Sequence, residues 1–144
     1  MRIDGEWALF DDGVIRPIVI GEISAADGSW VKCPFLVDTG ADRTVLTAAA
    51  LGQLGLRPIT SDDGISGLGG RAESVVIETQ IRLSRENSSK VVFRGQYAAV
   101  TEVESLDTCV LGRDITGLFA VIVDEARSVV CMLSQRHHYT IQVD

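Results

Sequence analysis

The sequence predicts an all-β fold in a single domain spanning residues 1–144. The chain has 144 residues, a length that suits one domain with one hydrophobic core, and 46% of them are hydrophobic. Its apolar runs are rich in β-branched and aromatic residues and are separated by short turn signals. The spacing of a long amphipathic helix is absent. We therefore expect strands over most of the chain and only one or two short helices.

The N-terminal half predicts three strands followed by a short helix. The strands are expected at residues 6–10, 14–23 and 29–37, and the turns between them at residues 11–13 and 27–28, which contain Asp-Gly pairs. After the third strand, Thr47 is a suitable N-cap and Gly55 a suitable residue to follow the last helical turn. A helix is therefore expected between them, although Gly52 weakens it.

The C-terminal half predicts further strand pairs and one more short helix. Residues 61–70 are too rich in glycine for a stiff core strand and suit a mobile hairpin whose tip can close over a ligand. Long strands are expected at residues 71–83 and 90–101, with a polar loop at 85–89. A short helix is expected at residues 114–118, and strands at 120–123 and 128–133. The alternating tail, residues 139–143, is a candidate for one more strand.

Charge and cysteine content limit the partners and the compartment. The formal net charge is −7, which argues against nucleic acid or an anionic membrane surface as a partner. No apolar stretch approaches the length of a membrane span, and the acidic first ten residues are unlike a signal peptide. An odd number of cysteines, three in all, predicts buried free thiols in a reducing, cytoplasmic setting. Zinc is the alternative ligand for them, but no Cys-x-x-Cys pair is present.

Residues 35–46 form the stretch that carries the most chemical information. An apolar strand, Phe35-Leu36-Val37, runs directly into Asp38, and a Thr39-Gly40 turn follows. A carboxylate at a buried strand end is costly unless it is hydrogen-bonded, and such groups cluster at functional sites. An ordinary turn aspartate is the alternative. A phosphatase that needs a second Asp at the position of Gly40 is excluded, and so is a P-loop enzyme, whose Gly-x-x-x-x-Gly-Lys motif is absent.

This stretch resembles the active-site loop of aspartic proteases, and in particular that of the retroviral type, the retropepsins. Three further blocks occur in the family's order. Arg16-Pro17 precedes the loop, residues 65–70 resemble the flap with Leu68 at its tip, and residues 111–114 resemble a strand-to-helix motif that usually ends in Asn where this chain has Asp114. The resemblance covers most of residues 14–133. It implies a closed retropepsin-like β-barrel with a flap hairpin.

The resemblance also implies an aspartic endopeptidase that works as a homodimer. Catalysis in this family needs two carboxylates, and the chain holds no second Asp-Thr-Gly or Asp-Ser-Gly after an apolar run. The second Asp38 must then come from another copy, with one active centre on a two-fold axis. No metal or other cofactor is expected. The expected substrate is a polypeptide bound in extended conformation between the flap and the loop.

Residue roles follow from the same resemblance. Asp38, Thr39 and Gly40 are the expected catalytic residues, with Thr39 bracing the pair of aspartates across the dimer. Arg16, Gly112 and Arg113 are expected to support the site and the dimer, with Asp42 bound to Arg113 of its own chain and to Arg16 of the partner. Substrate contacts are expected from Ala41, Asp42, Arg43, Ile65, Gly67, Leu68, Gly69 and Val110.

Several alternatives stay open at this point. The chain could be a catalytically silent dimer of the same fold that binds extended peptides, or a purely structural domain. The glycine-rich residues 64–70 could form a phosphate cradle, although no Lys follows them, or a plain surface loop. His137 and His138 could bind a metal, but a solvated tail is the simpler interpretation because adjacent side chains diverge on a strand. Trp7 and Trp30 are expected in the core or in an interface.

Overall fold

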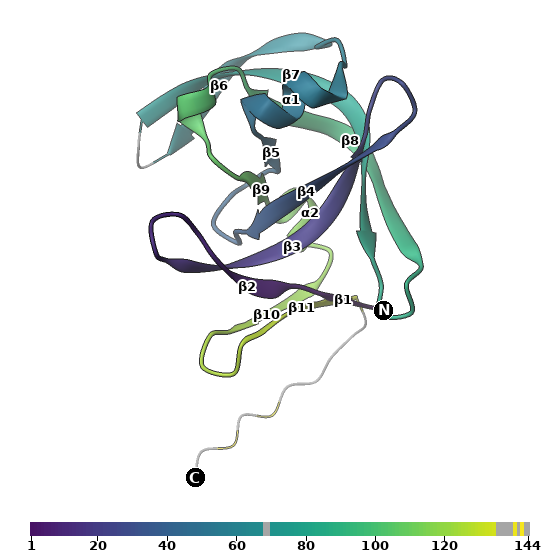
Figure 1. Cartoon of the computed structure of the whole chain (residues 1–144), viewed down its shortest axis with the longest axis vertical. Coiled ribbons are helices and arrows are strands. Elements are labelled where there is room, and N and C mark those ends of the chain that lie inside the picture. The colour runs from purple at the N-terminus through teal and green to yellow at the C-terminus, as the bar shows by residue number, and fades with distance from the viewer. Residues whose placement is uncertain (68–69, 135–139, 141, 143–144) are drawn as a thin grey trace.

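The structure is a computed structural model that describes residues 1–67, 70–134, 140 and 142, with the backbone alone described for 60–67 and 70. Strands dominate the described part of the chain (Figure 1). The elements are β1 (Arg2–Asp4), β2 (Glu6–Leu9), β3 (Ile15–Ser24), β4 (Trp30–Val37), β5 (Val45–Leu46), α1 (Ala48–Leu54), β6 (Thr60–Gly67), β7 (Gly70–Ser84), β8 (Lys90–Val100), the 3₁₀ turn η1 (Val103–Ser105), β9 (Cys109–Leu111), α2 (Arg113–Thr116), β10 (Ala120–Asp124) and β11 (Val129–Leu133).

The larger sheet closes into a barrel. Its strand order is β2-β3-β4-β9-β5-β8-β7-β6, and closure comes from an additional antiparallel pairing of β3 with β7. Gly21 lies at this closure, where an added Cβ would stand 2.9 Å from the ring of Phe35, so glycine lets the two strands meet over that buried ring. Core side chains with no exposed surface come from these strands: Ile23, Phe35, Leu46, Ile77, Ile81, Leu83 and Leu111.

An ion-pair cluster lies on the outside of the same closure. Arg82 donates to both carboxylate oxygens of Glu22, at 3.2 and 2.8 Å, and Lys90 donates to Oε1 at 2.9 Å. The guanidinium of Arg82 also stacks over the ring of Trp30, 4.0 Å from its centroid. These donors lower the pKa of Glu22 to about 2, with the hydrogen bond from Arg82 as the largest cause. The cluster therefore links β3, β7 and β8 most strongly while Glu22 is ionised.

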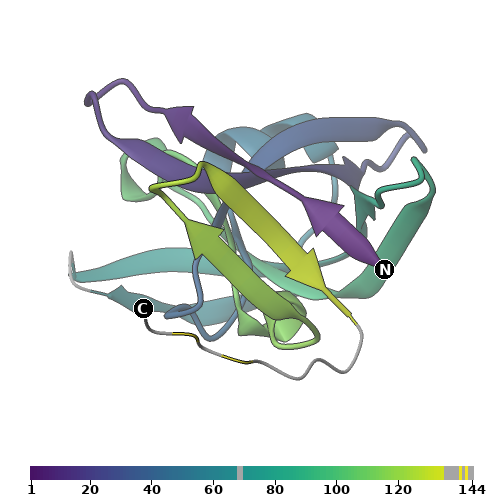
Figure 2. The ribbon, with the colours of Figure 1, turned by 90° about the horizontal axis from the view of Figure 1, so that it is seen from below.

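A smaller sheet packs beneath the barrel. Its order is β1-β11-β10, with antiparallel pairing throughout (Figure 2). Ile3 and Met132 from this sheet are fully buried and belong to the same core as the barrel. The side-chain N–H of Trp7 donates to the carbonyl of Val129 at 3.2 Å and so ties β2 to β11. The larger hydrophobic core is therefore shared by both sheets.

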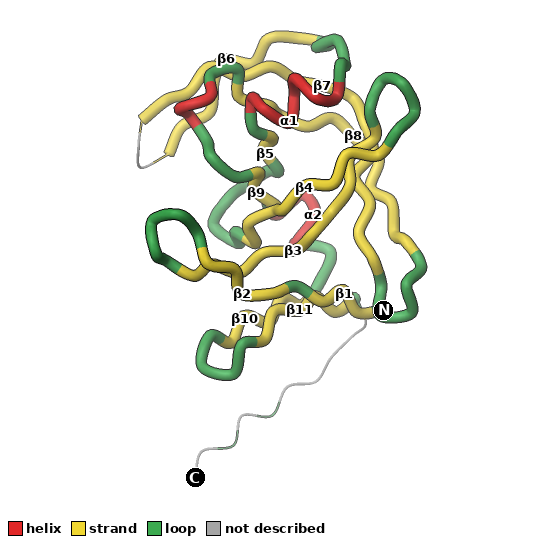
Figure 3. The backbone as a smooth tube through the Cα atoms, in the orientation of Figure 1, coloured by secondary structure: helices red, strands yellow, loops and turns green. Residues whose placement is uncertain are grey.

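Most predicted elements are present at the expected places (Figure 3). The helix between Thr47 and Gly55 is confirmed: the Thr47 hydroxyl accepts the N–H of Ala50 at 3.1 Å, and Gly55 adopts a left-handed conformation with φ of 64°. The turns at Gly13 and Gly28 also carry positive φ, as their Asp-Gly sequences predict.

The hairpin expected at the glycine-rich residues is present: residues 60–67 form strand β6, which pairs antiparallel with β7 and has a register shift between Asp62 and Ile65. Other features differ from the sequence-based expectation. Strand β1 and the turn η1 were not predicted, because each spans only three residues and carries charges. The suggested tail strand at 139–143 falls largely outside the described residues, as do His137 and His138.

The three cysteines are buried and free, as expected from their apolar contexts. The sulfurs of Cys33 and Cys109 lie 3.2 Å apart between the neighbouring strands β4 and β9. None of the helices in the described part of the chain is long and apolar enough to cross a bilayer.

Candidate active site

Strand β4 delivers Asp38 to the surface of the barrel. The strand ends at the buried Val37, and the Asp38 N–H continues the ladder by donating to the carbonyl of Leu111 at 3.2 Å. The Asp38 side chain itself is half-buried, and its Oδ1 accepts the N–H of Gly40 at 2.9 Å. An added Cβ at Gly40 would lie 3.2 Å from this oxygen. The turn glycine therefore allows a close approach to the carboxylate that it also holds in place.

The rest of the loop, residues 39–44, is fastened to the start of α2. The Ala41 N–H donates to the carbonyl of Asp38 at 3.2 Å, and the Ala41 carbonyl accepts the N–H of Arg113 at 2.9 Å. The Arg113 guanidinium reaches the carbonyl of Thr39, also at 2.9 Å. Thr39 and Gly40 are exposed. The loop is thus fixed from one side, while its Asp38–Gly40 tip stays open to a ligand or a partner.

Gly112 permits the contact between the two segments. An added Cβ at this position would stand 2.2 Å from the carbonyl carbon of Arg43 and 2.3 Å from its oxygen. A side chain of any kind would push the loop away, because these are backbone atoms. Gly112 therefore packs directly against the Asp38 loop.

Thr44 and Asp114 complete this support, although neither was predicted as a site residue. Thr44 is fully buried, and both its N–H and its hydroxyl donate to the Asp114 carboxylate, at 3.0 and 2.7 Å. The same hydroxyl accepts the N–H of Gly112 at 3.1 Å. Thr44 lies in the stretch 35–46 and Asp114 in the stretch 111–114, both of which resemble family motifs. A threonine and an acid in two segments that must pack together could therefore have indicated this contact.

Two predicted ion pairs have different outcomes. Asp42 pairs with Arg113 in the same chain, as expected, but their side chains are 86% and 52% exposed, so this pair lies at the surface of the chain. Arg16 binds both carboxylate oxygens of Asp12, at 3.0 and 2.7 Å, and stacks on Phe10. Its hydrogen bonds lower the pKa of Asp12 to about 2. The expected contact of Arg16 with the Asp42 of a partner stays a prediction.

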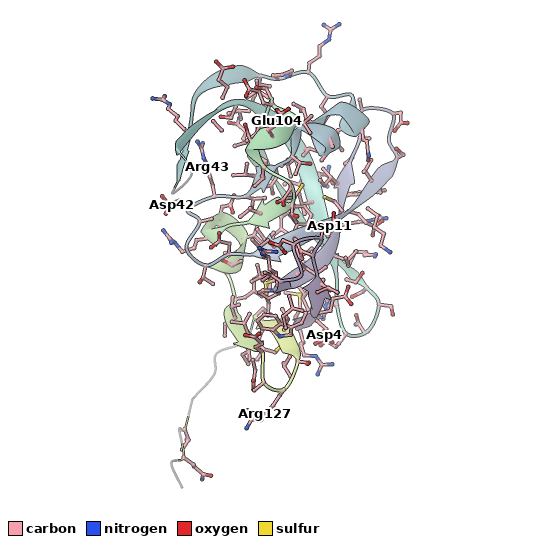
Figure 4. All side chains as sticks on the ribbon, turned by 60° about the vertical axis from the view of Figure 1, so that its left-hand side comes forward. Asp4, Asp11, Asp42, Arg43, Glu104 and Arg127 are labelled. Carbon is pink, nitrogen blue, oxygen red and sulfur yellow. The ribbon has the colours of Figure 1, made fainter. Side chains whose placement is uncertain are left out.

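The described residues predicted to contact substrate lie in three regions: the Asp38 loop, β9 and β6. Asp42 and Arg43 project from the loop on the same side of the molecule (Figure 4). Val110 is half-buried on β9, packed against the small cluster of Val45, Ala98 and Val100. Ile65 and Gly67 lie on β6, where their backbones pair with Ala72 and Gly70 of β7. Leu68 and Gly69 lie outside the described residues.

The comparisons with known proteins agree with this geometry. The family model described as aspartyl protease matches residues 19–115, which include β4, the Asp38 loop and most of α2. No curated protein sequence matches the chain.

Two solved structures are similar to it. The EIAV protease complexed with the inhibitor HBY-793 is 26% identical, with a TM-score of 0.53 over 76% of this chain and 92% of that chain. A retropepsin-like aspartic protease from Rickettsia conorii is 17% identical, with a TM-score of 0.57 over 92% of this chain and 91% of that chain. The second likeness shows the fold alone. With a family match over two thirds of its length and a barrel of the same type, this chain belongs to the aspartyl protease family and has a retropepsin-like fold.

Proposed function

We propose that this protein is an aspartic endopeptidase whose active centre combines the Asp38 of two identical chains. The observation that carries the proposal is the position of Asp38 at the open end of β4, where it accepts the Gly40 N–H within a matched aspartyl protease segment. A single carboxylate of this kind is half of the pair that the chemistry needs. The second half is then supplied across a two-fold axis.

In this mechanism the two carboxyl groups share one proton, because two like charges so close together cannot both ionise. The ionised Asp38 accepts a proton from a water molecule lying between the two groups. The protonated Asp38 donates a hydrogen bond to the carbonyl oxygen of the scissile peptide as water attacks its carbon. The tetrahedral intermediate is not bound covalently to the enzyme. It collapses when the leaving nitrogen takes up a proton.

The surroundings of Asp38 suit a substrate in extended conformation. The loop tip at Thr39 and Gly40 is exposed. The β6–β7 hairpin contains the residues that resemble a flap, and we expect it to supply backbone groups opposite this tip. An extended peptide would pair with both through main-chain hydrogen bonds. Arg43, beside Asp42, would contact side chains of the substrate.

The decisive experiment compares peptide cleavage by the wild-type chain and by Asp38→Asn. The variant keeps the size of the side chain and its acceptor for Gly40, so folding should be unchanged, and kcat/KM should fall by roughly 100- to 10,000-fold or more. Asp27→Asn is a matched control in the β3–β4 turn, where Asn can keep the local hydrogen bonds to Ser29. Full turnover by Asp38→Asn would refute the mechanism.

The stoichiometry of an inhibitor gives an independent test. A pepstatin-type transition-state mimic should bind one molecule per two chains, since a site on a two-fold axis cannot hold two ligands at once. Titration calorimetry measures this ratio directly. One inhibitor per chain would mean two independent sites and would exclude the shared active centre. Inhibitor binding without any cleavage of a peptide library would instead favour a silent peptide-binding dimer.

A further inference from the structure

Two of the three buried thiols lie against each other on the strands that support the candidate active site. The S–H of Cys33 donates to the sulfur of Cys109 across 3.2 Å, in the region where β4 and β9 run parallel. Cys33 is 8% exposed and Cys109 is 1% exposed. A buried cysteine packs like a small apolar residue, and the reactivity of its sulfur is what distinguishes it from one. The mechanism proposed above uses neither sulfur, so the pair is available for chemistry of its own.

The two sulfurs differ in the hydrogen bonds that they make. The sulfur of Cys109 accepts the Cys33 S–H and also the N–H of Thr47, at 3.4 Å. The hydrogen bond from Cys33 is the largest cause that lowers the pKa of Cys109, and the same contact raises the pKa of Cys33, which holds the shared proton. The thiolate is the form of a cysteine that attacks an oxidant. Cys109 is therefore the nucleophile of the pair, and Cys33 is the thiol placed to attack it in a second step.

The strands that carry the two sulfurs also position the candidate catalytic carboxylate. Strand β4 leads from Cys33 to Asp38, and β9 leads from Cys109 to Leu111, whose carbonyl accepts the Asp38 N–H at 3.2 Å. The two sulfurs of a disulfide are about 2.05 Å apart, roughly 1 Å closer than the free thiols of this pair. Because interiors are close-packed, they transmit a change of that size to neighbouring groups. A bond between the sulfurs would therefore shift β4 against β9 where the two strands hold Asp38.

We propose that hydrogen peroxide converts Cys33 and Cys109 into a reversible intramolecular disulfide, and that this modification lowers peptide cleavage; the second part rests on the proposed function. The Cys109 thiolate attacks one peroxide oxygen, so that an S–O bond forms while the O–O bond breaks, and the leaving hydroxide takes up a proton to become water. Cys33 then loses its proton and attacks the sulfur of Cys109. The S–S bond forms, the S–O bond breaks, and a second water leaves, so two thiols are oxidised as one peroxide is reduced. A dithiol reductant reverses the change by thiol–disulfide exchange.

The first test counts thiols after treatment with hydrogen peroxide and maps the linked peptides without reductant. In the denatured wild type, the three free thiols should fall to one, and dithiothreitol should restore all three. The mapped link should join Cys33 to Cys109. Cys131→Ser is the matched control, because it removes the buried thiol of β11 and should leave the link unchanged. Wild type that keeps three thiols, or whose cysteines are oxidised without this link, overturns the proposal. This result does not depend on peptide cleavage, so it is independent of the proposed function.

The second test measures peptide cleavage by the same samples. Oxidised wild type should lose roughly 10- to 100-fold in kcat/KM, since a displacement of about 1 Å can cost that much, and dithiothreitol should restore it. Cys33→Ala should cleave as well after peroxide as before, and Cys109→Ala repeats the test if Cys33→Ala does not fold. Cys131→Ser should lose and regain activity as wild type does. A linked wild type with unchanged kcat/KM overturns the effect on cleavage alone. Reduced wild type that cleaves no peptide counts against the proposed function and leaves the disulfide standing.

Discussion

The Asp114 carboxylate accepts both the backbone N–H and the hydroxyl of Thr44, across the packed boundary between the Asp38 loop and α2. Thr44 is fully buried, and its hydroxyl also accepts the Gly112 N–H at 3.1 Å. The Thr44 hydroxyl therefore satisfies two polar groups of the facing segment, the Gly112 N–H and the Asp114 carboxylate. Removing it would leave a buried N–H unpaired, which costs more than the hydrogen bond itself contributes.

Thr44→Val tests this link because valine keeps the shape of threonine and loses the hydroxyl. We expect the free energy of unfolding to fall by about 1–3 kcal/mol and peptide cleavage to fall as the loop loosens. Thr44→Ser keeps the hydroxyl and should lose much less. Thr101→Val, at an exposed position after β8, controls for the change of residue type. Chemical denaturation gives the free energies, and a Thr44→Val protein as stable as wild type would show that the link is dispensable.

Gly112→Ala should be among the most disruptive single-methyl changes in this region. The new Cβ would stand 2.2 Å from backbone of Arg43, so the Asp38 loop or β9 must move. We expect a loss of stability of about 1–3 kcal/mol or more, together with loss of cleavage. Gly52→Ala is the control, because nothing lies within 4 Å of a Cβ there. In helix α1 it should stabilise by about 1 kcal/mol. Similar thermal midpoints for Gly112→Ala and Gly52→Ala would contradict the close packing of Gly112 against the backbone of Arg43.

Glu22 predicts a specific loss of stability in acid. Its pKa in the folded protein is lowered to about 2 by hydrogen bonds from Arg82 and Lys90, below the ordinary value of an unfolded chain. A group whose pKa is lowered by folding stabilises the protein when the pH is above its pKa in the unfolded chain. This stabilisation is lost as the pH falls from about 5 toward 2. The free energy of unfolding of the wild type should therefore be about 1–2 kcal/mol larger than that of Glu22→Gln at neutral pH, a figure that allows for the partial solvent exposure of Glu22. Denaturation at pH 7 and pH 3 should show the difference narrowing, whereas Glu78→Gln, an exposed change on β7, should show no such trend.

Arg113→Lys should separate stability from activity. The guanidinium contacts the Thr39 carbonyl and the Asp42 carboxylate at once, and a lysine ammonium cannot hold both in this fork geometry. Because the pair is exposed in the chain, the free energy of unfolding should change by only about 0–1 kcal/mol. The rate of peptide cleavage should fall by more than this small stability change accounts for, because the Asp38 loop is no longer held in position. Arg94→Lys, an exposed change on β8, should affect neither. Equal activity of Arg113→Lys and wild type would show that Arg113 is not needed to position the Asp38 loop for catalysis.

The sequence by itself determined the features that depend on a few neighbouring residues. Asp38 at a strand end with its glycine turn, the Thr47 and Gly55 caps of α1, and the Asp-Gly turns are each specified by local backbone and hydrogen-bond chemistry. The order of the Arg16, Asp38 and Gly112 blocks was also sufficient to indicate the family. Strand periodicity then identified most strands of the barrel, because the alternation of buried and exposed positions in a strand gives an alternation of apolar and polar residues in its sequence.

Only the tertiary structure decided which distant segments meet. Thr44 and Asp114 are 70 residues apart, and their contact depends on β9 passing behind the loop. Strand β1 is three residues with charges at both ends, and it is a strand only because β11 offers it a partner. Pairings of this kind depend on the packing of the whole core, which no short stretch of sequence contains.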